Sequence, residues 1–177
     1  MLDKIRQSKF GEHNLILYEY YDTLCNIHLE YCKTALESLN EIVFLLSDNV
    51  SISNFFLGLK NTGLDVQKYR SEGSLIVVES KKGYFGLTNE LDLMIMINML
   101  LQRLIKLGKS GLTIFSDKGL FFHYNRIDDL IKHEAGLPMS LTSSKYNNKM
   151  KTFGCYNTKD FESLTDYQKQ MLIENHT

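Results

Sequence analysis

The chain has 177 residues and a nearly balanced charge, with 20 basic against 21 acidic side chains. A formal net charge of -1 without a long basic stripe argues against nucleic acid as the main partner. Because the N-terminal residues lack an apolar signal core and no apolar run approaches the roughly 20 residues that cross a bilayer, we expect one cytoplasmic domain with no membrane contact.

The N-terminal half is predicted to alternate strands and helices. Residues 1–12 are polar and are expected to form a leader, and residues 13–177 are expected to form the folded domain. Short apolar runs predict buried strands, and apolar residues at helical spacing predict the helices between them. In chain order these are strand 14–18, helix 22–39, strand 41–47, a short helix ending near Gly63, and strand 75–79.

The C-terminal half continues the same alternation. Its predicted elements are a turn at 83–86, helix 89–108, strand 112–116, helix 120–134, a polar loop at 136–149, strand 151–156 and a terminal helix. Helix 89–108 is apolar on most of its circumference, which indicates either a deep position in the core or a homodimer interface along 91–107. Thr165 and Gln168 have the spacing of a capping box for the terminal helix.

This order of elements predicts one α/β domain. Buried strands joined by crossover helices run parallel, so we expect three layers, with a mainly parallel sheet of about five strands between helices on both faces. In such sheets, ligands bind beyond the carboxyl ends of the strands. This rule selects the candidate ligand-binding residues Tyr18, Glu19, Asp48, Glu79, Asp117 and Tyr156.

The turn after the first predicted strand differs from a phosphate-binding loop. Such a loop needs glycines, so that backbone amides can wrap the phosphates, and a lysine that reaches the terminal ones. Here residues 18–23 read YEYYDT, with two acids and three bulky tyrosines. This composition argues against ATP hydrolysis. Because GxSxG, HExxH and CxxC are also absent from the sequence, we expect no catalysis and no cofactor.

Two further interpretations stay open at this point. Cys25, His28 and Cys32 share a helical face, and Cys155 would add a fourth soft metal ligand; the alternative is that these side chains simply pack against the sheet. Glu134 continues the apolar stripe of its helix, which indicates either a buried carboxylate with a raised pKa or a carboxylate held at a helix end. Its neighbour His133 is expected to be a cation that favours the same helix end.

The order and spacing of six segments resemble the MEDS domain, the sensory domain of DcmR-type regulators from methanogens and methylotrophs. The segments are HNLILYE from His13, EIVFLLSDN from Glu41, LKNTGLDVQKYRSEGSLIVVES from Leu59, HEAGLP from His133, FGCYNTKDF from Phe153 and NH at Asn175. This resemblance implies a fold related to KaiC and RecA without the phosphate loop. It also implies binding roles for the residues at recurrent positions of the family, which are His13, Tyr18, Glu134, Cys155 and Tyr156.

We therefore expect a non-catalytic domain that senses a small molecule, as the resemblance implies. Such domains are commonly attached to regulatory modules, so a signalling or transcription-regulatory protein is the expected partner. A first alternative is a degenerate RecA-like protein that binds nucleotide without hydrolysing it. A second is a metal or redox sensor that uses Cys25, His28, Cys32 and Cys155.

Overall fold

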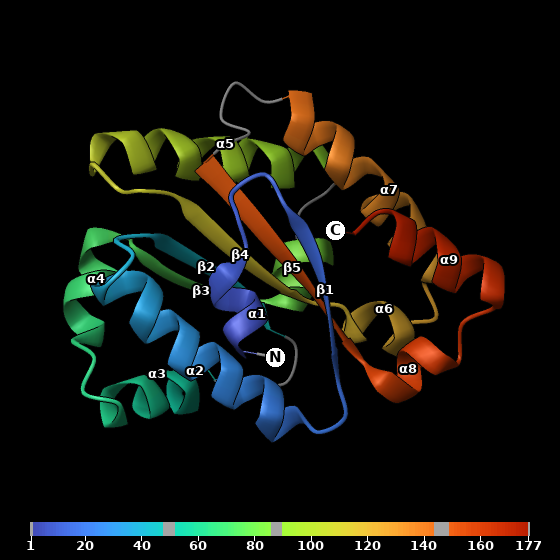
Figure 1. The fold of residues 1–177 in the computed structure, drawn as a ribbon, viewed down its shortest axis with the longest axis horizontal. Coiled ribbons are helices and arrows are strands. Elements are labelled where there is room, and N and C mark those ends of the chain that lie inside the picture. Colours follow the sequence, from blue (N-terminus) through green and yellow to red (C-terminus); the bar gives the residue numbers. More distant parts are fainter. Residues whose placement is uncertain (1, 48–51, 86–89, 144–148, 177) are drawn as a thin grey trace.

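The computed structural model describes residues 2–47, 52–85, 90–143 and 149–176. Five parallel strands form one sheet in the order β1-β5-β4-β2-β3, and helices cover both of its faces (Figure 1). The strands are β1 (His13–Tyr18), β2 (Ile42–Ser47), β3 (Leu75–Glu79), β4 (Leu112–Asp117) and β5 (Met150–Asn157). Each coincides with a predicted strand, so the three-layer α/β architecture is confirmed.

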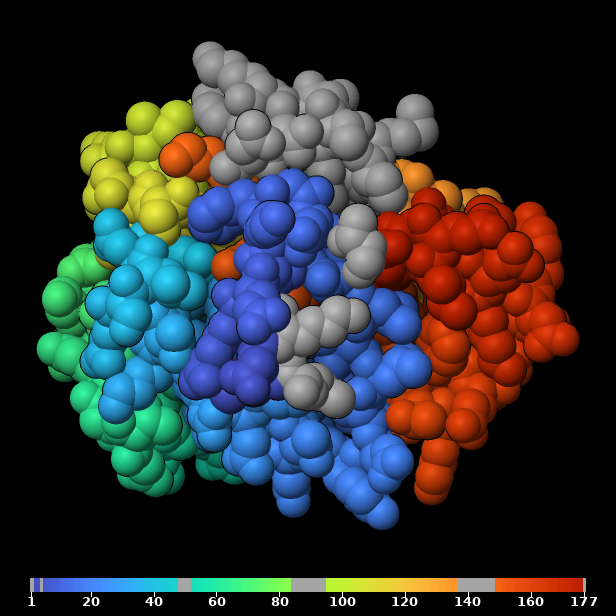
Figure 2. All heavy atoms as spheres, viewed as in Figure 1, coloured from blue at the N-terminus to red at the C-terminus, as the bar shows by residue number. Residues whose placement is uncertain are grey.

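The first face of the sheet is covered by the N-terminal helices. These are α1 (Leu2–Gln7), α2 (Tyr21–Glu37), α3 (Ile52–Asn61) and α4 (Val66–Glu72). In α2 the residues Leu24, Ile27 and Tyr31 are spaced three or four apart, so they share the side that packs on the sheet. Residue Ile5 of α1 joins the same core and is 3% exposed. In Figure 2, α1 (dark blue) lies between α2 (light blue) and the C-terminal helices (red).

The second face is covered by helices from the C-terminal half. They are α5 (Glu90–Lys106), which follows the short π-helix η1 (Lys81–Phe85), then α7 (Ile127–Ser143) and α9 (Asp166–Glu174). Two short helices, α6 (Gly119–His123) and α8 (Thr158–Glu162), directly follow β4 and β5. Within the described parts of the chain, no helix combines the length and the apolar character needed to cross a membrane.

The structure corrects three predicted segments. The helix predicted at 120–134 is two helices, because Asn125 adopts a left-handed backbone conformation (φ 52°) that an α-helix cannot contain. The loop predicted from 136 is helical as far as Ser143, and α7 continues through Pro138. Polarity in this segment was therefore a poor guide to irregular structure. Residues 83–85 of the turn predicted at 83–86 form the end of η1 instead, and residue 86 lies outside the described residues.

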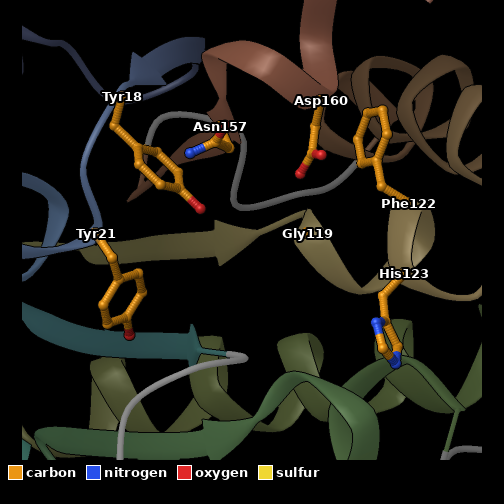
Figure 3. Close-up of a pocket in the computed structure, with 7 residues that line it drawn as sticks. All are labelled: Tyr18, Tyr21, Gly119, Phe122, His123, Asn157 and Asp160. Carbon is orange, nitrogen blue, oxygen red and sulfur yellow. The ribbon is translucent and has the colours of Figure 1, made fainter. Parts of the chain in front are cut away.

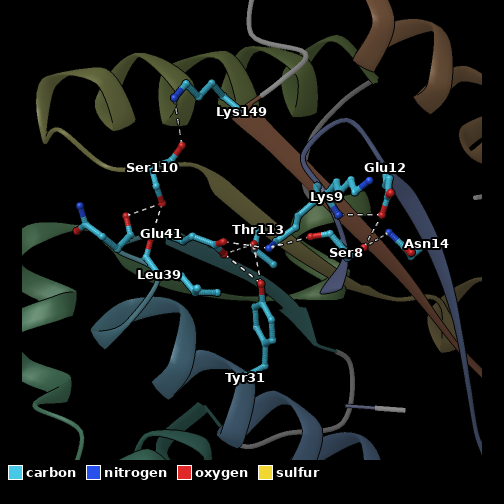
Figure 4. Close-up of polar contacts among 12 residues, drawn as sticks. Ser8, Lys9, Glu12, Asn14, Tyr31, Leu39, Glu41, Ser110, Thr113 and Lys149 are labelled. Atoms are coloured by element: carbon cyan, nitrogen blue, oxygen red, sulfur yellow. Dashed lines mark hydrogen bonds and ion pairs between the residues drawn. The ribbon is translucent and has the colours of Figure 1, made fainter. Parts of the chain in front are cut away.

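A buried polar network joins the amino ends of three neighbouring strands (Figure 4). Glu41, which precedes β2, accepts hydrogen bonds at Oε2 from the hydroxyls of Tyr31 (3.1 Å) and Thr113 (2.5 Å). Its Oε1 lies 2.9 Å from Nζ of Lys151 on β5. Because the carboxylate is 2% exposed, these partners replace the water that it loses on folding.

Candidate functional site

A cavity of about 380 Å³ opens at the carboxyl ends of the strands (Figure 3). It is lined by residues that follow or end β1, β4 and β5, which are Tyr18, Tyr21, Gly119, Phe122, His123, Asn157 and Asp160. The helix after β1 packs on the first face of the sheet, whereas the helices after β4 and β5 pack on the second face. The connections that follow these neighbouring strands therefore leave the edge of the sheet toward opposite faces. In an open parallel sheet this arrangement leaves a crevice between them.

The inner wall of the cavity is formed by Tyr18 and held by Asp117. The Tyr18 hydroxyl donates a hydrogen bond to Oδ1 of Asp117 over 3.3 Å, and the same oxygen accepts from the backbone N–H of Gly119 at 3.1 Å. Burial and the neighbouring Asp117 carboxylate raise the pKa of Tyr18. Tyr18 is therefore a neutral phenol whose ring orientation is set by a fully buried carboxylate.

Further polar groups surround the same space. Tyr21, in the first turn of α2, shares a hydrogen bond of 3.1 Å with Ser47 at the end of β2. Asn157 caps α8 by accepting from the backbone N–H of Lys159 at 3.0 Å. Figure 3 shows the Tyr18 hydroxyl and the Asp160 carboxylate directed toward the same space. Burial raises the pKa of Asp160 above its ordinary value.

The structure brings some of the candidate strand-end residues to this cavity. Tyr18 lines it and Asp117 supports it, while Glu19 is exposed beside it and accepts a hydrogen bond from Asn157 through its backbone oxygen. Glu79 lies outside the cavity lining and pairs with Lys82 at 3.0 Å. Asp48 is outside the described residues.

Tyr156 and Cys155 also lie away from the cavity lining, on opposite faces of β5. Successive side chains of a strand alternate between the faces of the sheet, so Cys155 enters the core under α2 and Tyr156 enters the core under α7 and α9. Both residues are fully buried. Position at a strand end was therefore a weaker guide than the face on which each side chain projects.

Six of the seven lining residues were missed by the sequence reasoning, and four of these belong to two short helices. Gly119, Phe122 and His123 come from α6, and Asp160 comes from α8. The prediction of one continuous helix over 120–134 hid α6. A signal for α8 was present in Asn157, since asparagine after an apolar strand is a typical N-cap.

A second polar cluster is buried on the other face, between β1, α7 and the C-terminal residues. Glu134 Oε2 lies 3.3 Å from Nε2 of His13 and 3.3 Å from Nε2 of His176. Its other oxygen, Oε1, lies 2.5 Å from Nζ of Lys118. Glu134 and Lys118 are 0% exposed. The sequence had left Glu134 undecided, and the structure places it in the interior with charged and imidazole neighbours.

The protonation states in this cluster follow from burial and from Lys118. Burial alone would raise the pKa of Glu134, but Lys118 and the nearby histidines lower it to about 2. The carboxylate is therefore ionised. Burial lowers the pKa of His13 to about 3 and also lowers that of His176, so both imidazoles are neutral. The raised pKa considered for Glu134 is wrong, because a buried ammonium outweighs desolvation.

His133 is also neutral, which corrects its predicted role as a cation. Burial and the nearby Lys118 lower its pKa to about 3. The prediction placed His133 at a helix end, but α7 continues for ten residues beyond it, to Ser143. No helix terminus is therefore available there to favour a positive charge.

The cysteine cluster proposed from the sequence does not assemble. Among the described residues, Cys25, His28, Cys32 and Cys155 do not bring three ligand atoms within 4.8 Å of one another. All three thiols are free, and burial raises the pKa of Cys32 to about 12 and that of Cys155 well above its ordinary value. Protonated, buried thiols are poor metal ligands and poor redox nucleophiles.

The arrangement of strands and helices is similar to a solved structure of the KaiC type. A KaiC-like protein from the hyperthermophilic archaeon Pyrococcus horikoshii superposes with a TM-score of 0.60 at 13% sequence identity, over 94% of this chain and 70% of that chain. No family model matches the sequence, and no curated protein matches it, so membership of the MEDS family stays a prediction. The chain has a KaiC/RecA-like α/β fold.

Proposed function

We propose that this protein is a non-catalytic regulatory domain that binds a small organic molecule in the cavity at the carboxyl ends of β1, β4 and β5. The observation that carries the proposal is the chemistry of the cavity lining. It combines two tyrosines, a phenylalanine, an imidazole, an amide and a carboxylate, and none of the described lining residues is a lysine or an arginine. Pockets of a few hundred cubic ångströms are typical of small-molecule sites, and a lining with this many polar groups favours a polar ligand.

The turns around the cavity disfavour phosphate groups. The turn after β1 supplies Glu19 and Tyr21 rather than glycine and lysine. The turn after β4 does contain Lys118, but this ammonium is fully buried against Glu134 and is not part of the cavity lining. The carboxylate of Asp160 instead favours an uncharged polar ligand or one with an amine.

The proposal is tested by thermal-shift and calorimetric titration with two sets of probes. One set contains small alcohols, amides and amines, and the other contains ATP and ADP with Mg²⁺. We expect stabilisation by the first set, which reaches about 2.7 kcal/mol at a hundredfold excess over Kd, and none by the nucleotides.

The variant Asp160→Asn removes the charge from the cavity and preserves its shape. We expect it to weaken amine binding by about 10- to 100-fold, the worth of one charge-assisted hydrogen bond. Asp166→Asn is the matched control, because Asp166 is also a first-turn aspartate but lies on α9 outside the cavity lining. Absence of binding by every compound of the first set contradicts the proposal, as does equal weakening by both variants.

A second candidate is nucleotide binding without hydrolysis, which the KaiC-like fold favours. The same titration separates the two functions, because stabilisation by ATP or ADP alone supports this second candidate. Phosphate release from ATP that is lost in Asp117→Asn, a variant at the carboxylate behind Tyr18, would contradict both candidates.

A further inference from the structure

The buried cluster around Glu134 has the geometry of a metal site. The ligand atoms of His13, Glu134 and His176 lie within 4.8 Å of one another. Nitrogen and oxygen ligands about 2.1 Å from a tetrahedral ion are about 3.4 Å apart, which is close to the 3.3 Å that separates Glu134 Oε2 from each imidazole Nε2. This cluster lies on the opposite face of the sheet from α2 and does not depend on the function proposed for the cavity.

A backbone contact of His176 orients its ring toward the carboxylate. Nδ1 of His176 lies 2.5 Å from the backbone oxygen of Leu172, which can only accept, so Nδ1 carries the proton. Nε2 is then the ring nitrogen that faces Glu134 Oε2, at 3.3 Å, and it is the atom available to bind an ion there. A backbone carbonyl on the far ring nitrogen is also the usual support for a metal-binding histidine.

Two neighbours prepare the cluster for an ion. Lys118 binds Oε1 of Glu134 at 2.5 Å, which leaves Oε2 for a ligand bond. Gly154 on β5 lies beneath the His176 ring, where an added Cβ would be only 2.9 Å from Nε2. The glycine therefore provides the space that lets this imidazole reach the cluster.

We propose that His13 Nε2, Glu134 Oε2 and His176 Nε2 bind one divalent transition-metal ion of the Zn²⁺ or Fe²⁺ type. Two imidazoles and one carboxylate are the ligands that such ions prefer, whereas Ca²⁺ and Mg²⁺ select oxygen ligands. The bound ion joins β1, α7 and the segment after α9, which are far apart in the sequence. Its main effect is to fasten α9 to the sheet.

The test uses the full chain, purified without a histidine tag and stripped with a chelator. Zn²⁺, Fe²⁺ under anaerobic conditions, and Co²⁺ are then titrated separately, with binding followed by elemental analysis, by the visible spectrum of Co²⁺ and by Tm. We expect one equivalent per chain, a rise in Tm, and a Co²⁺ spectrum without an intense thiolate band. A substoichiometric metal content with no change in Tm overturns the proposal, and so does a thiolate band.

Variants place the ion in this cluster. His176→Gln is expected to weaken metal binding by more than about 100-fold, since loss of a direct ligand exceeds the usual effect of an outer-shell change. His123→Gln is the matched control, because His123 is exposed and lies outside the cluster. Gly154→Ala should also weaken binding, whereas Gly136→Ala, where an added Cβ meets no atom within 4 Å, should not. Wild-type affinity in folded His176→Gln overturns the proposal, and the wild-type titration decides alone if the variants do not fold.

Discussion

At the scale of single residues, the buried carboxylate of Glu41 has the contacts whose effect on stability can be tested most directly. Its two oxygens are held by Tyr31, Thr113 and Lys151 at the amino ends of the strands (Figure 4). Removing one partner of a buried ion pair leaves a charge without compensation, which is worse than removing both.

We predict that Lys151→Met lowers the free energy of unfolding by about 3–5 kcal/mol, because it leaves the Glu41 carboxylate buried without its ammonium. The double variant Glu41→Gln/Lys151→Met should recover a large part of this loss. Urea denaturation of the two variants and the wild type measures both effects. A single variant as stable as the wild type would show that the pair contributes nothing.

A second residue-scale prediction concerns pH. Burial lowers the pKa of His28 from 6.5 to about 3, and neither ring nitrogen has a hydrogen-bond partner among the described residues. The unfolded chain therefore binds a proton at His28 that the folded chain excludes. Stability from this residue is complete above about pH 6.5 and is lost as the pH falls toward 3.

The variant His28→Leu removes this proton uptake. As the pH falls from roughly 6 to 4, the wild type should lose stability that the variant keeps. The free energy of unfolding of the variant, relative to that of the wild type, should therefore rise by about 1.4 kcal/mol for each unit by which the pH falls. Urea titrations at several pH values measure the difference. His123→Gln, at an exposed site, is the control. A difference between His28→Leu and the wild type that does not change with pH would show that the buried imidazole is protonated in the folded state.

At the scale of elements, α9 shows how a local signal supports a long-range contact. The predicted capping box is confirmed, since Thr165 Oγ1 accepts from the backbone N–H of Gln168 at 3.3 Å and the Gln168 side chain accepts from the N–H of Thr165 at 3.0 Å. The helix packs the fully buried Leu172 against the second face of the sheet and leads to His176.

We predict that Thr165→Ala lowers the free energy of unfolding by about 0.5–2 kcal/mol through loss of the N-cap. Hydrogen exchange should accelerate first in α9, because the substitution acts at its first turn. Ser163→Ala is a suitable control, because Ser163 is exposed and lies just before α9, and its hydroxyl donates to the backbone oxygen of Asp160 rather than to α9. Equal effects of the two substitutions would contradict a specific role for the cap.

Element boundaries show where local patterns were reliable. The five strands were predictable within one or two residues, because four of them are the short apolar runs that are typical of buried parallel strands. The break between α6 and α7 was not, because it depends on one left-handed residue, Asn125. The length of α7 was also missed, since a polar sequence that contains Pro138 is compatible with both a loop and a helix.

At the scale of the whole molecule, the outer side of α5 is the candidate surface for self-association. Its inner residues Ile97, Leu101 and Leu104 are buried under the sheet, whereas Met99 and Ile105 are 65% and 59% exposed. The inner side of α5 therefore matches the predicted core position, and its exposed outer side is available for the predicted interface. We propose that the outer side forms a homodimer contact, as expected for residues 91–107.

The proposed dimer is tested by sedimentation. Wild-type protein is expected to be a dimer, and Met99→Lys is expected to be a monomer, because a charged side chain would be buried in the contact. Tyr167→Lys is the matched control, since Tyr167 is 72% exposed on α9 rather than on α5. A monomeric wild type, or a Met99→Lys variant that is still a dimer, would contradict the proposed interface.

The residues of the candidate sites also differ in whether the sequence could predict them. Tyr18 and Asp117 were accessible to sequence reasoning, because residues that end parallel strands gather at one edge of the sheet. Phe122, His123 and Asp160 were not, since their contribution depends on how two short helices turn over that edge. The histidines at positions 13 and 176 meet at Glu134 only because β1 and the end of α9 lie beside α7.

Local patterns of apolar residues were thus sufficient for the strands, the layers and the absence of a phosphate loop after β1, because each depends on neighbours along the chain. The strand order β1-β5-β4-β2-β3, the burial of Lys118 against Glu134 and the face on which Tyr156 projects required the folded chain. These features are contacts between residues far apart in sequence, and their free energy comes from removing several side chains from water together.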